Sequence, residues 1–431
     1  MQNLTAELLP RLESHRLDGV DAGSGSIYPF YEGGSLVNLP GSICHWLGAP
    51  EFGAQPLLPE ILNQHAPGAR HVILLVIDGM GLNTLEVAVR QAQHDSNLAV
   101  WEDLTASGCL APMTSIAPST TAAALTTFWT GAAPAQHGVV AYEVWLKEYG
   151  VIANMILHSP ASFYGDVGSL RKGGFDPETF LPVKTLGRHL GAHGVRVFAH
   201  QHQAIARSGL STMLLQGAEI VPFRSLSDLW VSMNGVLDAH AVERTYSYIY
   251  WGDLDEHSHR YGPEDERVGL ELAAFSRQLE YFLRARRKRD RGDTLLLITA
   301  DHGHIFTPKK PEYEVRNHPE LLDCMVMFPS GEARMPLVYL RPGREEKFLR
   351  YLETTWPGEF LAMPSEQAVQ AGLFGTGEVY PPFRDRIGDW VVFPQGDAYW
   401  WFSPSRDNPL LGRHGGLNRT EMLVPLVSIR L

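Results

Sequence analysis

The sequence predicts an α/β fold with an open, mainly parallel sheet flanked by helices. Apolar runs of strand length recur at 71–77, 195–200, 246–251 and within 294–303, and a further one lies at 422–429. Uninterrupted runs of this kind are typical of strands that are buried on both faces. Helical stretches separate them, and the clearest, 264–286, begins with acidic residues and ends with basic ones, as the helix dipole favours.

Two stretches differ from this alternation. Residues 1–68 are rich in glycine and proline and predict an irregular N-terminal lead-in with short helices. Residues 337–375 predict a small β-α-β-α insert, in which a short strand precedes a charged amphipathic helix, a second strand and a second helix. We therefore expect the α/β core to span 69–336 and 376–431, with the loop 307–314 as a hinge or lid.

Composition excludes several classes of protein. The 431 residues carry a formal net charge of −12, which repels nucleic-acid backbones, so no nucleic-acid polymer is expected as a partner. Three sparse cysteines predict neither a disulfide framework nor a thiolate zinc site. Charges and Pro10 interrupt the N-terminal segment, and the apolar runs are too short to span a bilayer. These features favour a cytoplasmic protein without membrane association.

Three carboxylates lie at or just beyond the ends of predicted strands. Asp78 and Asp301 follow their apolar runs almost directly, and Asp255 lies just past 246–251. In open α/β sheets, ligands bind beyond the carboxyl ends of the strands. Two of these residues have histidines close by, in Asp301-His302 and in Asp255-x-x-x-His259, and this ligand set suits Zn²⁺ or Mn²⁺. A single Asp at such a position is more often a helix cap or turn residue. The prediction of a metal site therefore depends on three such aspartates occurring together with nearby histidines.

Two further segments contribute candidates. Ser119, Thr120 and Thr121 precede three alanines, which predicts a helix N-terminus where backbone N–H groups favour an anion. The alternative is plain helix capping, because a threonine hydroxyl is a poor nucleophile unless a base or metal activates it. His414 lies between Arg413 and a pair of glycines, where it is either a metal ligand or an ordinary loop histidine.

Taken together, these motifs resemble the type I phosphodiesterase/nucleotide pyrophosphatase family of the alkaline phosphatase superfamily. The family's nucleophile lies ten residues before a Thr-Gly glycine and sixteen before a His-Gly histidine, and counting back from Gly131 and His137 gives Thr121 in both cases. The Asp-x-x-x-His-x-x-Gly-Pro motif matches 255–263, and Asp-His-Gly matches 301–303. The matched motifs occur along this chain in the same order as in the family.

The resemblance implies two divalent metal ions, Zn²⁺ or alternatively Mn²⁺, and a nucleophilic threonine that forms a phosphothreonine. One metal would be held by Asp78, Asp301, His302 and the Thr121 oxygen. The other would be held by Asp255, His259 and His414. The implied partner is a small phosphate-ester substrate, and such a metal pair would clamp an in-line displacement at phosphorus.

The chain departs from the family pattern at two positions. Ala124 stands where the family often has an asparagine that donates to phosphate, which weakens the case for nucleotide diesters. Ser258 replaces a glycine before His259, and His257 is an alternative ligand, although the spacing favours His259. His257 and His304 are also candidates for contacts with the ligands.

The remaining question is the substrate class. Three Asp and an ionised threonine balance two divalent ions, and the segment 112–138 contains no arginine, which favours a singly charged diester over a dianionic monoester. The alternatives are a phosphomonoesterase or mutase of the same superfamily, or a non-catalytic relic. A monoesterase would need another cation, with Arg90 and Arg171 as candidates. His200 and His202, at the end of a predicted strand, are candidates for the substrate pocket.

Overall fold

A seven-stranded sheet forms the centre of the computed structural model, which describes residues 2–161, 166–289, 292–404 and 406–431. Its strand order is β2-β16-β9-β1-β8-β6-β7. The strands are β1 (His71–Ile77), β2 (Cys109–Thr114), β6 (Arg196–His202), β7 (Glu219–Phe223), β8 (Thr245–Trp251), β9 (Thr294–Thr299) and β16 (Leu423–Arg430). The five strands β9, β1, β8, β6 and β7 are parallel, and β16 runs antiparallel to both of its neighbours. The predicted α/β class is confirmed.

Strands β1, β8 and β9 lie side by side in the middle of this sheet and are buried along their full length. Their apolar and aromatic side chains pack on both faces, as the uninterrupted runs predict. This packing fixes the register and the position of the residues that follow each strand. The carboxyl ends of the three strands therefore lie at one edge of the sheet.

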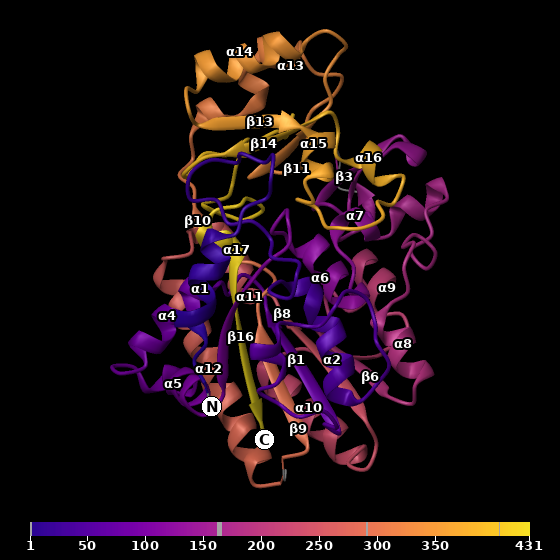
Figure 1. Cartoon of the computed structure of the whole chain (residues 1–431), viewed down its shortest axis with the longest axis vertical. Coiled ribbons are helices and arrows are strands. Elements are labelled where there is room, and N and C mark those ends of the chain that lie inside the picture. The colour runs from indigo at the N-terminus through magenta and orange to yellow at the C-terminus, as the bar shows by residue number, and fades with distance from the viewer. Residues whose placement is uncertain (1, 162–165, 290–291, 405) are drawn as a thin grey trace.

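Helices cover the sheet in two groups (Figure 1). One group contains α2 (Leu39–Leu47), α6 (Thr121–Thr130) and α8 (Leu186–Ala192). The other contains α4 (Leu82–Gln91), α5 (Ala99–Ser107), α10 (Leu226–Ala239) and α12 (Glu266–Arg287). Asp265 caps α12 by accepting from the Arg267 N–H, close to where the charge pattern places the start of this helix. Shorter helices are α3 (Pro59–Leu62), α7 (Pro134–His137), α9 (Gly209–Leu214), α13 (Pro319–Leu322), α16 (Phe383–Arg386) and α17 (Arg419–Met422).

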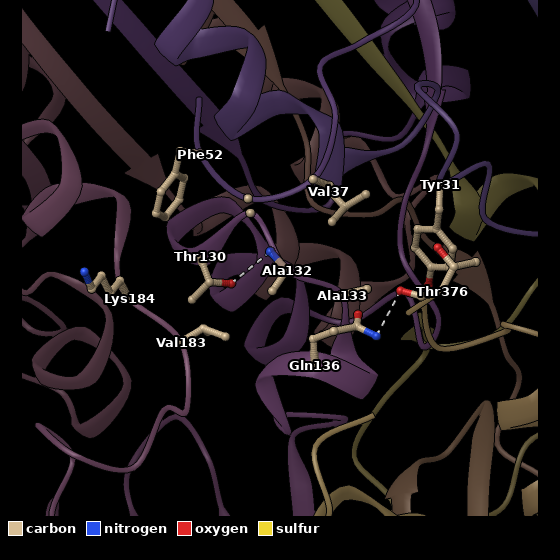
Figure 2. Close-up of a pocket in the computed structure, with 13 residues that line it drawn as sticks. Tyr31, Val37, Phe52, Thr130, Ala132, Ala133, Gln136, Val183, Lys184 and Thr376 are labelled. Carbon is tan, nitrogen blue, oxygen red and sulfur yellow. Dashed lines mark hydrogen bonds between the residues drawn. The ribbon is translucent and has the colours of Figure 1, made fainter. Parts of the chain in front are cut away.

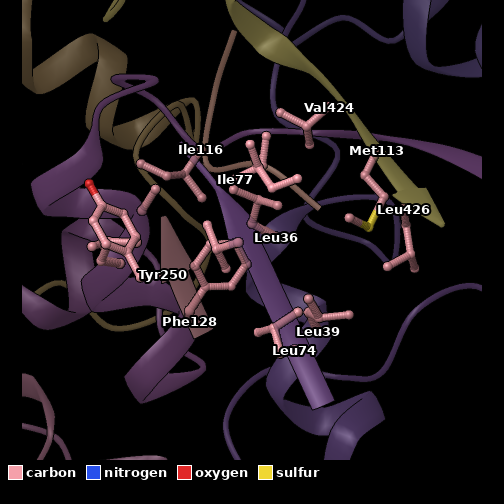
Figure 3. Close-up of a cluster of buried hydrophobic side chains, with 14 of the residues drawn as sticks. Leu36, Leu39, Leu74, Ile77, Met113, Ile116, Phe128, Tyr250, Val424 and Leu426 are labelled. Atoms are coloured by element: carbon pink, nitrogen blue, oxygen red, sulfur yellow. The ribbon is translucent and has the colours of Figure 1, made fainter. Parts of the chain in front are cut away.

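The N-terminal segment is packed into the core. After α1 (Thr5–Ser14) it holds short helical turns, and Leu36 and Leu39 are completely buried. Figure 3 shows these two leucines beside Leu74 of β1 and Phe128 of α6. The segment thus covers part of the main sheet, and the helix that begins at Thr121 is held on this side of the core.

A second seven-stranded sheet lies above the main one in Figure 1, and its pairings are antiparallel. Its strands are β3 (Glu143–Leu146), β4 (Val151–Asn154), β5 (Ser159–Pro160), β11 (Ser330–Glu332), β12 (Met335–Val338), β13 (Phe360–Pro364) and β14 (Trp390–Pro394). The β-α-β-α order expected within 337–375 corresponds to β12, α14 (Glu345–Thr355), β13 and α15 (Ser365–Gln370). These elements belong to a sheet that also takes strands from 143–160 and 390–394, and the proposed unit boundaries remain a prediction.

A short antiparallel pair links the two layers. Strand β10 (Ile305–Phe306) pairs with β15 (Gly412–Arg413), which brings the segments 301–306 and 412–416 together. Within the part of the chain that the structure describes, helices are too short or too polar to cross a membrane.

Candidate metal and active site

The three predicted aspartates meet at the carboxyl edge of the main sheet. Asp78 directly follows β1, and Asp301 follows β9 after one residue. Asp255 lies in the first turn of α11 (Asp253–Tyr261), which begins just after β8. Because β9, β1 and β8 are adjacent and parallel, their ends deliver all three carboxylates to one place.

Asp78, Asp301 and His302 form the first cluster, which is almost completely buried. The His302 Nε2 lies 3.3 Å from Asp78 Oδ1 and 3.4 Å from Asp301 Oδ2. Neither of these two oxygens has a hydrogen-bond partner among the residues described. The other Asp301 oxygen accepts from the backbone N–H groups of Gly79 and His302, which fixes the carboxylate. Two unpaired buried carboxylate oxygens facing one imidazole nitrogen are suited to a cation.

Asp255, His259 and His414 form the second cluster. Asp255 and His259 are one turn apart on α11, with 3.4 Å between Asp255 Oδ1 and His259 Nε2. The His259 Nδ1–H donates to the Gly412 carbonyl and the His414 Nδ1–H to the Ser119 carbonyl. These bonds leave both Nε2 atoms as acceptors, although they lie only 3.2 Å apart. Two facing lone pairs are unfavourable unless a cation binds them both.

The electrostatics of the clusters agree with this geometry. Burial lowers the pKa of His302, lowers that of His259 to about 4 and holds that of His414 well below its usual value. Burial therefore favours the neutral imidazole, which is the form that can bind a metal ion, at all three positions. Burial, with the charges of Asp255 and Asp301, raises the pKa of Asp78 well above its usual range. Burial also opposes ionisation of Asp255, yet the neighbouring histidines lower its pKa overall. Neutral histidines together with three carboxylates fit divalent ions such as Zn²⁺ or Mn²⁺.

Thr121 is the first residue of α6, and its hydroxyl lies at the first cluster. Its Oγ1 is 3.1 Å from His302 Nε2, and the side chain is 8% exposed. Neighbouring serines bind this segment to the ligand loops, since Ser119 Oγ donates to the Gly416 carbonyl and Ser115 Oγ to the Asp301 carbonyl. The threonine is therefore held in place by the same loops that carry the ligands.

Glycines permit the close approach of these loops. Gly79 has a φ of +75°, and a Cβ there would lie 2.8 Å from His304 Cδ2. A Cβ on Gly303 would lie 2.1 Å from the Thr420 carbonyl oxygen. The glycines of Asp-Gly and Asp-His-Gly are thus required by packing around the ligands.

The structure separates the other histidine candidates. His257 points its Nδ1–H at the Asp253 carbonyl, is half-buried and lies outside the clusters. His304 Nε2 lies 2.6 Å from Asp255 Oδ1, so His304 orients this carboxylate or serves as a further ligand. The sequence alone gives no role to Tyr250, whose buried hydroxyl donates to Asp78 Oδ2. The alternation of β8 could have identified it, because Tyr250 lies near the carboxyl end of that strand.

A cavity of about 620 Å³ opens beside Thr121, Asp255, His259 and His414. Most of its remaining lining comes from the second sheet and from the segments 400–404 and 406–410. Apolar walls are formed by Ile152, Ile156, Phe328, Trp401, Phe402 and Leu410. Charged groups in the lining are Glu143, Glu332 and Arg406.

The lining differs from two expectations. His200 is completely buried within β6, and neither His200 nor His202 lines this cavity. Arg90 and Arg171 are exposed and do not line it either. The arginine that does is Arg406, which the sequence did not indicate because it lies 285 residues from Thr121 (406 − 121).

A second cavity, of about 480 Å³, lies at the C-terminal end of α6, opposite the end that carries Thr121 (Figure 2). Phe52, Val183 and Lys184 line it, together with Thr130 and Gln136. The predicted metal ligands are absent from its lining, so it is separate from the Asp/His clusters.

The mostly parallel α/β sheet, with clustered Asp and His at its carboxyl edge, agrees with the alkaline-phosphatase-like fold predicted from the sequence. The chain belongs to the type I phosphodiesterase/nucleotide pyrophosphatase family, whose sequence model matches residues 72–417. The family predicted from the motifs is thus confirmed. This is a family of metal-dependent phosphoester hydrolases. A comparison with curated protein sequences finds no match.

Solved structures with this fold include two enzymes. Murine ectonucleotide pyrophosphatase/phosphodiesterase 5 is 16% identical with a TM-score of 0.59, and the match covers 82% of this chain and 87% of that one. Phosphonoacetate hydrolase from Sinorhizobium meliloti 1021, in complex with phosphonoformate, is 19% identical with a TM-score of 0.60. That match covers 84% of this chain and 91% of the hydrolase. At these identities the likeness establishes the fold.

Proposed function

We propose that the protein hydrolyses phosphodiesters with Thr121 as nucleophile and two divalent metal ions, Zn²⁺ or alternatively Mn²⁺. The observation that carries this proposal is the position of the Thr121 hydroxyl, 3.1 Å from the His302 Nε2 of one ligand cluster and in the same cavity as the other. The proposed ligands are Asp78, Asp301, His302 and the Thr121 oxygen for one ion. Asp255, His259 and His414 are the proposed ligands for the other.

Such ions would lower the pKa of the Thr121 hydroxyl and neutralise charge on the leaving oxygen. The chain itself supplies the orientation. Helix α6 holds the hydroxyl at its N-terminus, where free backbone N–H groups favour a phosphoryl oxygen. Attack by Thr121 on phosphorus would release the alcohol and form a phosphothreonine, which water then hydrolyses.

The charges around the cavity support a diester. Glu143 and Glu332 contribute two carboxylates to the lining, whereas Arg406 contributes one guanidinium. Beyond the ligand clusters, the lining therefore has an excess of negative charge when both glutamates are ionised. A singly charged diester is disfavoured less by this environment than a dianionic monoester.

The apolar walls suit an ester with a flat or apolar substituent. Trp401 and Phe402 line the cavity, as do Ile152 of β4 and Ile156, which follows that strand. An inactive threonine-to-alanine variant of murine ectonucleotide pyrophosphatase/phosphodiesterase 5, with the same fold, was solved in complex with AMP. We therefore include nucleotide-sized esters among the small substrates that this protein would take.

Arg406 favours the second candidate, a phosphomonoesterase. It lines the cavity, and its Nη2 lies 3.8 Å from Glu143 Oε1. A guanidinium released from Glu143 could bind the second charge of a monoester. The diester proposal is preferred because Glu143 already neutralises this cation.

Thr121→Ala tests the proposed mechanism. We expect loss of bis(p-nitrophenyl) phosphate hydrolysis with an unchanged circular dichroism spectrum, because the substitution removes the nucleophile and keeps the carboxylates. Thr120→Ala is the matched control and should retain most activity. Full activity in purified Thr121→Ala protein would refute the assignment.

The cellular location remains a prediction. Cys44, Cys109 and Cys324 are unpaired and buried, which suits a reducing compartment, and we propose the cytoplasm on this ground.

A further inference from the structure

Glu332 is a buried carboxylate beside the proposed nucleophile. It is the last residue of β11 in the second sheet, and it is 9% exposed. Its Oε1 accepts from the Thr120 hydroxyl and from the Tyr142 backbone N–H, both at 2.7 Å. These bonds fix the carboxyl group of Glu332 against Thr120, the residue that directly precedes Thr121 in the sequence.

The same side chain also touches the loop that carries His414. A Cβ on Gly415 would lie 2.6 Å from the Cβ and 2.8 Å from the Cγ of Glu332, so the two residues are in close contact. Glu332 therefore lies between the segment of the nucleophile and the loop of a proposed ligand. It also lines the cavity into which the substrate would fit.

Glu332 has no ion-pair partner among the residues that the structure describes, unlike Glu421 and Glu143, which each lie beside an arginine. Arg334, two residues later, is bound to Glu421 with 2.8 Å between Nη2 and Oε2. Arg406 lies beside Glu143 rather than Glu332. Burial is the main cause that raises the pKa of Glu332 to about 7. The charges of Glu143 and Asp255 act in the same direction, whereas the hydrogen bonds from Tyr142 and Thr120 oppose the rise. At pH values well above this pKa, Glu332 is ionised and the cavity holds a carboxylate that no basic side chain in the described part of the chain neutralises.

We propose that Glu332 is a specificity-determining residue that disfavours dianionic phosphoryl groups and so directs the site to singly charged diesters. The inference rests on the proposed function, which places the phosphoryl group at Thr121. Like charges in a poorly solvated cavity repel strongly, and the repulsion is larger for a group with two charges than for one. Since Thr120 and Tyr142 hold the carboxylate, it cannot easily turn away.

Glu332→Gln tests the role of the charge, because glutamine keeps the shape and the Oε1 acceptor. At about pH 9, where the wild-type side chain is ionised, we expect the ratio of kcat/KM for p-nitrophenyl phosphate to that for bis(p-nitrophenyl) phosphate to rise about tenfold. Glu332→Asp keeps the charge and should keep a ratio close to that of wild type. Glu366→Gln, which removes an exposed glutamate on α15, controls for the change in net charge. If Glu332→Gln does not fold, Glu332→Met is the second neutral variant.

A binding measurement separates this inference from the proposed function. Calorimetry on metal-loaded protein at the same pH compares inorganic phosphate, a dianion, with dimethyl phosphate, a monoanion. We expect the neutral variant to bind phosphate about tenfold more tightly and dimethyl phosphate equally well. Tighter phosphate binding without hydrolysis of either ester would support the role of Glu332 and overturn the proposed activity. Unchanged phosphate binding and an unchanged hydrolysis ratio would overturn the role of Glu332 alone.

Discussion

His137, which ends the short helix α7, is completely buried, and its environment accepts only the neutral imidazole. Its Nδ1 accepts from the Val139 N–H at 3.1 Å, so the proton is on Nε2, which lies 3.1 Å from Thr127 Oγ1. Burial, with the charge of Arg386, lowers its pKa to about 3. In the unfolded chain a histidine has a pKa of about 6.5.

The unfolded state therefore binds a proton between about pH 6.5 and pH 3 that the folded state does not, and stability falls as the pH falls through this window. At pH 5 the pH lies about 1.5 units below the unfolded pKa, so the loss from this residue is about 2 kcal/mol, at about 1.4 kcal/mol per unit. His137→Gln removes this titration while glutamine can still donate to Thr127.

The assay is urea unfolding of wild type and variant at about pH 7.5 and pH 5, each analysed for the free energy of unfolding. We expect the loss between the two pH values to be about 2 kcal/mol smaller in His137→Gln than in wild type. Other buried histidines and the ligand clusters also change the free energy of unfolding with pH, but they do so equally in both proteins, so their contributions cancel in the comparison. His94→Gln, at an exposed position, is the control and should match wild type. An equal loss in His137→Gln and wild type would refute the reasoning.

Further expectations concern the site itself. Elemental analysis should find two divalent ions per chain, and Asp255→Asn should lower the content toward one; a content near zero after loading wild type with metal would contradict the assignment. Chelation should lower Tm, because ions that bind only the folded chain stabilise it, and an unchanged Tm would argue against bound metal. Wild type should hydrolyse bis(p-nitrophenyl) phosphate with a higher kcat/KM than p-nitrophenyl phosphate, and a tenfold or larger preference for the monoester, worth about 1.4 kcal/mol, would overturn the diesterase proposal. Arg406→Ala should lower monoester turnover at least as much as diester turnover. A selective loss of diester turnover would contradict the interpretation that Arg406 favours the second charge of a monoester.

The central strands could be predicted because burial on both faces leaves a pattern that depends only on neighbouring residues. The predicted runs at 71–77 and within 294–303 correspond to β1 and β9, and Asp78 and Asp301 follow these strands at the positions that the proposed chemistry requires. Strand β2 was missed. It contains Pro112, which lacks a donor for the ladder, and an edge position tolerates it.

The second sheet could be predicted only in part, since its pairings join segments far apart in the chain. Strand β3 follows α6 and α7 and pairs with β11, nearly two hundred residues later. Strands of three or four residues carry too little periodicity to be recognised alone. Glu332 and Arg406 were missed because they reach the cavity that Thr121 lines only through that sheet and through the segment after its last strand.

The ligand clusters and most of the cavity wall are supplied by different parts of the chain. Asp78, Asp255 and Asp301 are positioned by the ends of the main-sheet strands, whereas 143–161, 400–404 and 406–410 form much of the wall. A chimaera that receives these wall segments from a relative should therefore keep its metal affinity and acquire the donor's choice of ester. Selection can act on metal affinity and on the choice of ester separately. A change of substrate in this family therefore need not begin with a change in the residues that hold the metal ions.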